Sequence, residues 1–219
     1  MRESSYAHCL DESTLSFREE NYMKMVAATN NKGKLAELVS ILSNLGIEVI
    51  SLDEAGFNEE IIESGKTFEE NALIKAETVM RKTGLSAIGD DSGLEIDALN
   101  GEPGIYSARY AEPGKRKKTV LEKLQGVPEE KRTARFVCAI ACVLSNGEKI
   151  VTKGTCEGII INECRGEGGF GYDPIFYVPE YSQTFAEMPP ELKNSISHRA
   201  KAIRLMVEKL KGRLNDAVI

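Results

Sequence analysis

The chain has 219 residues, a length that fits one large domain or two small lobes with a buried core. It carries 28 Lys and Arg against 34 Asp and Glu, which gives a formal net charge of −6. This acidic balance argues against broad, sequence-independent binding to nucleic acid polymers or to anionic membranes.

Cysteine usage and hydropathy predict a cytoplasmic protein. The five cysteines are an odd number without a C-x-x-C pair, which argues against a disulfide framework or a zinc site. No apolar run approaches the ~20 residues of a membrane-spanning helix. We expect residues 1–24 to be a flexible extension or to reflect an upstream start, residues 25–212 to form a single domain, and residues 213–219 to be a C-terminal tail.

Strand and helix patterns alternate in the first half of the chain. Leucines at steps of three and four predict an amphipathic helix that ends near Gly46. Thr67 and Glu70 form a capping box at the start of a second helix, which Gly84 closes. The predicted elements are a strand at 25–29, a helix over 35–45, a strand at 47–52, a loop at 53–66, a helix over 67–83 and a short strand at 86–89.

The second half predicts a long antiparallel hairpin and a final helix. An apolar run at 134–144 and a strand pattern at 149–158 flank Asn146 and Gly147, a strong hairpin turn. Apolar residues from 196 to 214 recur at steps of four and three, which is typical of a helix with one buried face. Together these elements predict an α/β fold with a mixed sheet flanked by helices.

Two glycine motifs fail in their context. The stretch from Ser64 to Thr67 resembles the end of a P-loop, but the required first glycine would fall at Glu60. The stretch 166–171 fits G-x-G-x-x-G, yet a strand pattern follows it where a dinucleotide fingerprint needs a helix. We interpret neither as a phosphate-binding motif of these classes.

The turn from Thr29 to Lys34 is a candidate anion site. It lies where the first strand leads into the first helix, so its free backbone N–H groups and the helix dipole favour a negative ligand. Lys34 in the first turn is unfavourable for the dipole unless an anion compensates. The alternative is a solvated surface turn.

Asp90 and Asp91 form an acidic pair at the end of the predicted strand 86–89. Successive strand side chains face opposite ways, so at most one of the two is expected to point into a shared site. With a third acid such as Glu63, that carboxylate could hold Mg²⁺ together with phosphate oxygens. The alternative is an acidic turn.

Two further segments combine residue types that bind ligands. Four glycines between Arg165 and Asp173 allow close approach of the backbone to a ligand, and Phe170 and Tyr172 are candidates to stack on a base. The alternative for this loop is a covering of the core edge. His198 and Arg199 lie off the apolar stripe of the last helix, so we expect both to be free for a ligand. The alternative for His198 is a structural or solvated histidine.

Helix spacing, a charge run and strand spacing add three smaller expectations. Asn71 and Lys75 are one turn apart on the same helix face. The basic run 115–118 has no interleaved aromatic residue, so we interpret it as a solvated loop rather than a nucleic-acid contact. Cys138 and Cys142 share a strand face and are expected to be core thiols.

The ordered motifs resemble those of the inosine triphosphate pyrophosphatase family. The resemblance runs from about residue 25 to 210 and rests on six blocks in the same order. The blocks are T-x-N-x-x-K-x-x-E from Thr29, E-S-G-x-T-F-x-E-N-A-x-x-K from Glu63, the run from Asp90 to Ala111, GGFGYDPIF from Gly168, TFAEM from Thr184, and KNSISHR from Lys193.

This resemblance implies a set of functional residues. It implies that Glu63 and Asp91 bind Mg²⁺, and that Asp91 also orients or deprotonates the attacking water. It implies that Ser92 touches the substrate and that Lys75 assists phosphate binding. The implied phosphate-binding residues are Thr29, Asn30, Asn31, Lys32, Gly33 and Lys34, and the implied base-binding residues are Phe170, Gly171, Tyr172, Asp173, Lys193, His198 and Arg199.

The resemblance further implies a fold and an activity. The fold would be two lobes around a long twisted sheet with the site between them, in a homodimer. The activity would be hydrolysis of ITP, dITP and XTP to the monophosphate and pyrophosphate. The alternatives are a related pyrophosphatase that prefers pyrimidines and a nucleotide-binding regulator without turnover.

Overall fold

The computed structural model describes the backbone of residues 23–216 and the side chains of residues 23–211. The rest of the expected N-terminal extension over 1–24, and residues 217–219 of the expected tail, lie outside the described residues. The elements are β1 (Met23–Ala27), α1 (Lys32–Ser43), β2 (Ile47–Ile50), α2 (Phe68–Thr83), β3 (Ala87–Ile96), α3 (Arg116–Lys123), β4 (Thr133–Val143), β5 (Lys149–Ile160), β6 (Phe176–Val178), β7 (Gln183–Thr184), α4 (Pro190–Ile196) and α5 (His198–Asp216).

The strands form one mixed sheet with the order β2-β1-β3-β4-β5-β6-β7. β1 pairs in parallel with β2 and β3, and all later pairs are antiparallel. The prediction of a mixed sheet flanked by helices is therefore confirmed. The β4–β5 hairpin also matches its predicted position.

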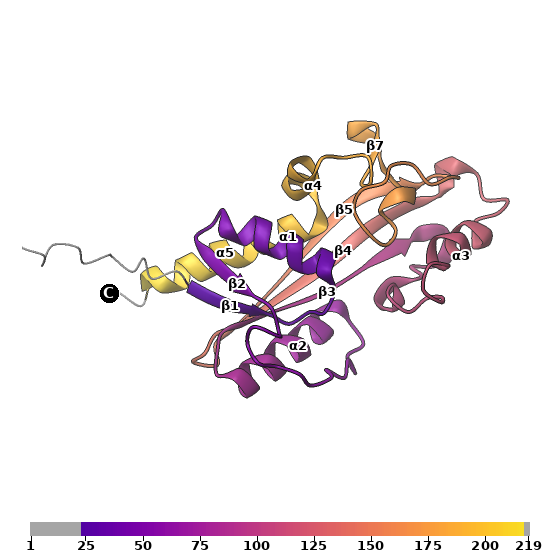
Figure 1. The fold of residues 1–219 in the computed structure, drawn as a ribbon. Coiled ribbons are helices and arrows are strands. Elements are labelled where there is room, and N and C mark those ends of the chain that lie inside the picture. Colours follow the sequence, from indigo (N-terminus) through magenta and orange to yellow (C-terminus); the bar gives the residue numbers. More distant parts are fainter. Residues whose placement is uncertain (1–22, 217–219) are drawn as a thin grey trace, which may run out of the picture.

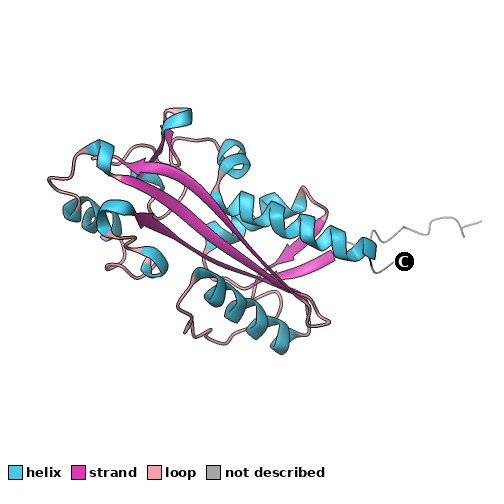
Figure 2. Cartoon of the chain, turned by 180° about the vertical axis from the view of Figure 1, so that it is seen from behind, coloured by secondary structure: helices cyan, strands magenta, loops and turns pink. Residues whose placement is uncertain are grey.

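Two lobes are joined by the long strands β3, β4 and β5, which run through both (Figure 1). Helices α1, α2 and α5 lie around one end of these strands, whereas α3 and the short strands β6 and β7 lie toward the other end. Seen from behind, the three strands form a twisted ribbon between the two groups of helices (Figure 2). The expected two-lobed fold is thus confirmed.

Separate apolar clusters fill the two lobes. In the first lobe, one cluster joins α1 and α5 to the sheet, and two smaller clusters pack around α2. In the second lobe, a cluster with aromatic residues such as Phe136, Phe176 and Phe185 joins β4 to β6 and β7. Because β3, β4 and β5 run through both lobes and are hydrogen-bonded to one another, they fix the orientation of one lobe relative to the other.

Helix α2 is stabilised at both ends by the predicted signals. Thr67 is the N-cap and its side chain accepts a hydrogen bond from the backbone N–H of Glu70, at 3.1 Å. Gly84 closes the helix in the left-handed conformation that favours glycine. Because both ends of α2 are fixed by these caps, Asn71 and Lys75 lie on the helix face that packs against β3.

Strand β3 is longer than the sequence predicts. The prediction placed a short strand at 86–89 with Asp90 and Asp91 at its end, but β3 continues through both acids and Gly93 to Ile96, which excludes the alternative of an acidic turn. The acids are buried among charged partners, and Gly93 packs so closely that a Cβ there would lie 2.3 Å from the carbonyl oxygen of Gly104. Tertiary packing therefore overrides the turn propensity of these residues.

The basic run and the final helix also differ from expectation. Residues 116–118 belong to helix α3 rather than to a loop. The expected last helix is divided at Ser197 into α4 and α5, so Ile196 ends the first and His198 begins the second. None of the described helices is long and apolar enough to cross a membrane.

Candidate functional site

A cavity of about 330 Å³ lies between the two lobes. This volume is within the range of small-molecule sites. Of the residues implied by the resemblance, Lys32 and Gly33 do not line it. The others do: Thr29, Asn30, Asn31, Lys34, Glu63, Lys75, Asp91, Ser92, Phe170, Gly171, Tyr172, Asp173, Lys193, His198 and Arg199.

The turn before α1 forms one end of this cavity. Asn31 is the N-cap, and its side chain accepts a hydrogen bond from the backbone N–H of Lys34 at 3.1 Å. Thr29 Oγ1 accepts from the backbone N–H of Asn31 at 3.2 Å. The side chain of Lys34 turns back to Asp90, at 2.7 Å from Nζ to Oδ1. The strand-to-helix junction that the sequence predicts is present, with a cation beside it.

Gly33 and Lys32, the two residues of this turn that do not line the cavity, differ in their environment. Lys32 is exposed. A Cβ on Gly33 would lie 2.6 Å from the ring of Phe170, so the absence of a side chain lets the first helical turn approach the glycine loop closely. Gly33 therefore contributes to the site through Phe170 rather than by facing the cavity.

Asp91 is held by two side chains of α2. Lys75 Nζ lies 3.0 Å from Asp91 Oδ1, and Asn71 Nδ2 donates to Asp91 Oδ2 at 3.2 Å. Lys75 Nζ also lies 3.2 Å from Glu63 Oε1. Burial raises the pKa of Asp91 above its ordinary value, although Lys75 and Lys34 act against this effect. A buried carboxylate with a raised pKa beside a second carboxylate is an arrangement suited to base chemistry.

Asp90 occupies the opposite side of β3. Its carboxylate accepts from Arg199 Nε at 2.6 Å and from Ser92 Oγ at 3.0 Å, and Lys34 lies against the same group. The thiol of Cys138 donates to it at 3.2 Å. Burial acts to raise the pKa of Asp90, but Arg199 and Lys34 outweigh burial and hold the pKa well below its usual range. The expectation that only one of the two acids faces a shared site agrees with this geometry.

Arg199 lines the cavity but is already paired within the protein, so its contact with a base stays a prediction. Its side chain is 1% exposed, and it donates to Asp90, to Ser92 at 3.0 Å and to Glu37. The apolar stripe of α5 predicts only which face packs on the sheet. It does not show that the first turn is buried by α1 and β3.

Glu37 is a residue that our sequence reasoning did not assign. Its carboxylate is paired with Arg199 and, at 2.7 Å, with Lys193 Nζ. Lys193 Nζ is also 2.7 Å from Asp173 Oδ2. In the sequence, Glu37 is marked only by its position three residues after Lys34, on the same face of the helix. Its partners Lys193 and Arg199 lie more than 150 residues away along the chain, so no local pattern indicates them. Glu37 connects α1 with α4 and α5.

The glycine loop contributes one aromatic side chain to the cavity and one mainly to the core. Tyr172 is 3% exposed, and its hydroxyl donates to the carbonyl oxygen of Ser107 at 2.9 Å, so it anchors the loop to the second lobe. Phe170 is half-buried, and Lys193 Nζ lies 4.9 Å from its ring centroid. A strand, β6, follows the short turn after this loop, which confirms that the motif is not a dinucleotide fingerprint.

His198 is buried and has an unpaired ring atom. Its ring stacks on Phe136, with 4.8 Å between ring centroids, and Nδ1 has no hydrogen-bond partner. Burial, reinforced by Arg199, holds the pKa of His198 well below its ordinary value. His198 therefore lines the cavity while its ring packs against the core, and its contact with a ligand stays a prediction.

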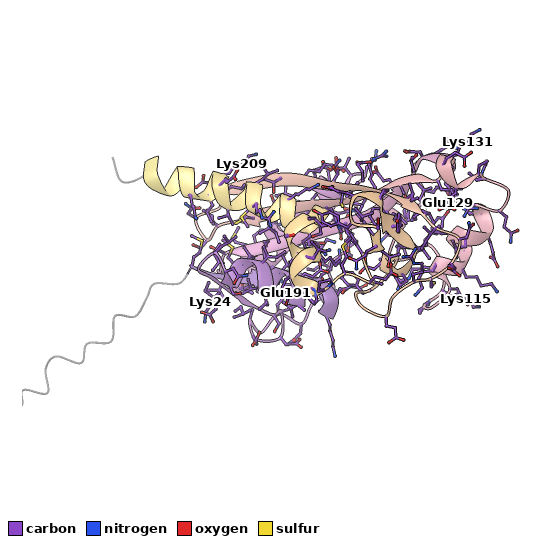
Figure 3. All side chains as sticks on the ribbon, turned by 90° about the horizontal axis from the view of Figure 1, so that it is seen from above. Lys24, Lys115, Glu129, Lys131, Glu191 and Lys209 are labelled. Carbon is purple, nitrogen blue, oxygen red and sulfur yellow. The ribbon has the colours of Figure 1, made fainter. Side chains whose placement is uncertain are left out.

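The second lobe adds cations that sequence reasoning missed. Arg109 and Arg116 both line the cavity. Arg116 belongs to the basic run that we interpreted as solvated, whereas Lys115 extends from the outer edge of that lobe (Figure 3). The sequence of the basic run does not show which of its side chains faces the cavity, because this depends on how α3 packs against the rest of the lobe.

Comparison with known proteins identifies the family. A sequence model of the Ham1 family matches residues 25–209. The dITP/XTP pyrophosphatase of Desulforamulus reducens is 52% identical over 190 residues, which cover 85% of this chain and 94% of that protein. The dITP/XTP pyrophosphatase of Geobacter sulfurreducens is 47% identical over 191 residues, covering 85% of this chain and 96% of that protein.

Solved structures agree with the sequence relatives. The Staphylococcus aureus Ham1 protein superimposes with a TM-score of 0.76 at 43% identity, covering 87% of this chain and 99% of that chain. A HAM1 protein from Coxiella burnetii gives the same TM-score, identity and coverage. The family model, the relatives and the shared fold together show that this chain belongs to the Ham1 family.

Proposed function

We propose that this chain is a nucleoside-triphosphate pyrophosphatase that hydrolyses ITP, dITP and XTP to the monophosphate and pyrophosphate. The observation that carries the proposal is the environment of Asp91, a buried carboxylate with a raised pKa between Lys75 and Asn71 at the wall of the cavity. The relatives named dITP/XTP pyrophosphatase support the substrate class.

Asp91 acts as the general base in this proposal. A carboxylate whose pKa is raised accepts a proton from water more readily, and two donors fix its orientation. Lys75 supplies positive charge beside the reacting phosphate, where negative charge develops in the transition state. Burial acts to lower the pKa of Lys75, but Asp91 and Glu63 outweigh it and raise the pKa, so the side chain remains charged.

The residues at Asp91 fit a magnesium ion. The carboxylates of Glu63 and Asp91 both reach one cation, the Lys75 ammonium, at 3.2 and 3.0 Å. No group of three or more His, Cys, Asp or Glu side chains in the described part of the chain is arranged to hold a metal. Two carboxylates match Mg²⁺, which takes its remaining ligands from water and substrate phosphates. When bound, Mg²⁺ would neutralise phosphate charge and polarise the scissile bond.

The triphosphate is bound at the turn before α1. Backbone N–H groups at the helix start and the side chain of Lys34 favour an anion there. Thr29, Asn30 and Asn31 line the same end of the cavity. Ser92, between Asp90 and Arg199, contacts the substrate beside the reacting group in this proposal.

The base is bound between the glycine loop and α5. Phe170 offers an aromatic face, and buried donors such as Lys193 favour a base with a 6-oxo acceptor. Adenine presents an amino donor at that position, so a buried donor of the site would remain unpaired and ATP would be rejected.

A substrate panel tests the proposal. Pyrophosphate release is measured with ITP, dITP, XTP, ATP, GTP and dTTP, with and without Mg²⁺. We expect release from ITP, dITP and XTP with Mg²⁺ and much slower release from ATP and GTP. Release from dTTP alone would indicate pyrimidine preference, and binding of ITP without release would indicate a regulator.

Assembly and compartment belong to the same proposal. We expect a homodimer, which light scattering of the purified chain tests directly. A cytoplasmic location is supported by the described cysteines, because Cys138, Cys142, Cys156 and Cys164 form no disulfide bond with one another.

A further inference from the structure

Six cationic side chains line the cavity, and they divide into two groups. Arg109 and Arg116 have no carboxylate within 4.0 Å among the described residues. The other four cations each form at least one salt bridge with a carboxylate, and these are Lys34, Lys75, Lys193 and Arg199.

The paired group supplies no excess of positive charge. Its four cations are matched by five carboxylates that belong to Glu37, Glu63, Asp90, Asp91 and Asp173. A nucleoside triphosphate is a polyanion, so the side-chain charges of this group, without Mg²⁺ and the backbone N–H groups at the start of α1, give no net attraction for it. The two unpaired arginines are the cavity cations whose charge no described carboxylate compensates.

The arginines are held in place without carboxylates. Arg116 Nη1 donates to the carbonyl oxygen of Ala108 at 3.1 Å, and the guanidinium of Arg109 lies 5.1 Å from the ring centroid of Tyr106. The same segment is fixed to the glycine loop, because Tyr172 donates to the carbonyl oxygen of Ser107 at 2.9 Å. These contacts leave most of the N–H groups of both guanidinium groups available to a ligand.

The two arginines also come from the lobe opposite to the predicted phosphate site. The turn before α1 belongs to the first lobe, whereas Arg116 begins α3 in the second lobe (Figure 1). Both parts line one cavity. A ligand that contacts both therefore spans the gap between the lobes.

We propose that Arg109 and Arg116 bind phosphate oxygens of the nucleotide from the second lobe, opposite the turn before α1. This inference rests on the proposed function. The planar guanidinium fork matches two phosphate oxygens at once, which makes arginine better suited than lysine to this task. Such a contact is made in the bound substrate as well as in the transition state, so it acts on binding more than on turnover.

Steady-state kinetics with ITP test the inference. For Arg109→Gln and for Arg116→Gln we expect KM for ITP to rise roughly 5- to 20-fold, the size of one partly exposed charged hydrogen bond, with kcat within about twofold. Arg109→Lys should retain part of the effect because the charge remains. The matched control is Lys118→Gln on α3, an exposed residue paired with Glu122, and it should leave KM unchanged.

Competitive inhibitors identify which part of the nucleotide is contacted. Tripolyphosphate should inhibit both Gln variants more weakly than the parent chain by a factor similar to the change in KM, whereas inhibition by inosine should not change. An unchanged KM in both variants would overturn the inference, as would weaker inhibition by inosine alone. If the parent chain releases no pyrophosphate from any nucleotide, the proposed function fails instead, and tripolyphosphate binding measured by calorimetry still tests the arginines.

Discussion

Asp90 and Asp91 are adjacent in β3 but serve opposite sides of the sheet. Asp90 contacts Arg199 and Lys34, and these charges hold its pKa well below the usual range despite burial. Asp91 contacts Lys75, and burial raises its pKa. The alternation of strand side chains thus gives two identical neighbours different roles: Asp90 is a structural carboxylate whose charged form is stabilised, and Asp91 is a group suited to accept a proton.

Replacing Asp91 by Asn should abolish most of the turnover. We expect Asp91→Asn to bind ITP but to hydrolyse it at least ~100-fold more slowly, because the carboxylate that accepts the proton is lost. Calorimetry measures the binding and pyrophosphate release measures the rate. Asp53→Asn, at an exposed position outside the cavity, is the control and should keep the parent rate. Unchanged turnover in Asp91→Asn would remove this residue from the mechanism.

The buried Asp90–Arg199 pair should contribute far more to stability than an exposed pair of the same chemistry. Asp90→Asn removes the carboxylate that pairs with both Arg199 and Lys34 and leaves Glu37 alone to compensate the buried Arg199 charge, so we expect a loss of roughly 3–5 kcal/mol in the free energy of unfolding. The matched control is Asp97→Asn, whose side chain is 46% exposed and contacts Arg135 at 2.9 Å. Its loss should be about 1 kcal/mol or less. Chemical denaturation of both variants measures the difference, and equal losses would contradict the prediction.

Acid should destabilise the chain partly through His198. Its pKa in the folded state is well below 6.5 because of burial and Arg199, so the unfolded chain binds a proton that the folded chain does not. This stability is complete above about pH 6.5 and decreases as pH falls, by about 1.4 kcal/mol per pH unit for one proton.

Replacing His198 by Gln removes this titrating group. The free energy of unfolding, measured by urea denaturation between about pH 7 and 5, should fall less steeply in His198→Gln than in the parent chain. The chain has two histidines, so His8→Gln is the natural control. We expect the control to keep the parent slope, and the same slope in His198→Gln would show that another group is responsible.

A side chain at Gly89 should displace α2 and thereby reduce both stability and turnover. A Cβ at this position would lie 2.1 Å from the carbonyl oxygen of Ala72, within the helix that carries Asn71 and Lys75 to Asp91. Backbone cannot yield as a flexible side chain does, so we expect Gly89→Ala to lose roughly 1–3 kcal/mol of stability and to lower kcat.

A second glycine provides the comparison for that variant. A Cβ on Gly168 would have its nearest neighbour at 3.0 Å and the next at 3.8 Å, so Gly168→Ala should cost less stability than Gly89→Ala. Thermal unfolding and pyrophosphate release are measured on both. A Gly89→Ala chain with parent stability and parent kcat would show that α2 tolerates the displacement.

Local signals predicted much of the fold. The caps at Thr67 and Gly84 bound α2 as expected, and the turn at Asn146 and Gly147 joins β4 to β5. Such features depend on residues a few positions apart, so they can be read from the chain directly. The same reasoning failed for β3, where residues typical of turns become a central strand once neighbouring charges and close packing stabilise them.

The sequence by itself determined which residue types are present and in what order, and the resemblance of its motifs to a known family pointed to the candidate site at Asp91, Lys75 and Glu63. Only the tertiary structure decided their partners. Arg199 lies 109 positions from Asp90, and Lys193 lies 156 positions from Glu37. Pairs so distant form because burial in a shared interior makes an unpaired charge costly, and that cost depends on the whole fold rather than on any local pattern.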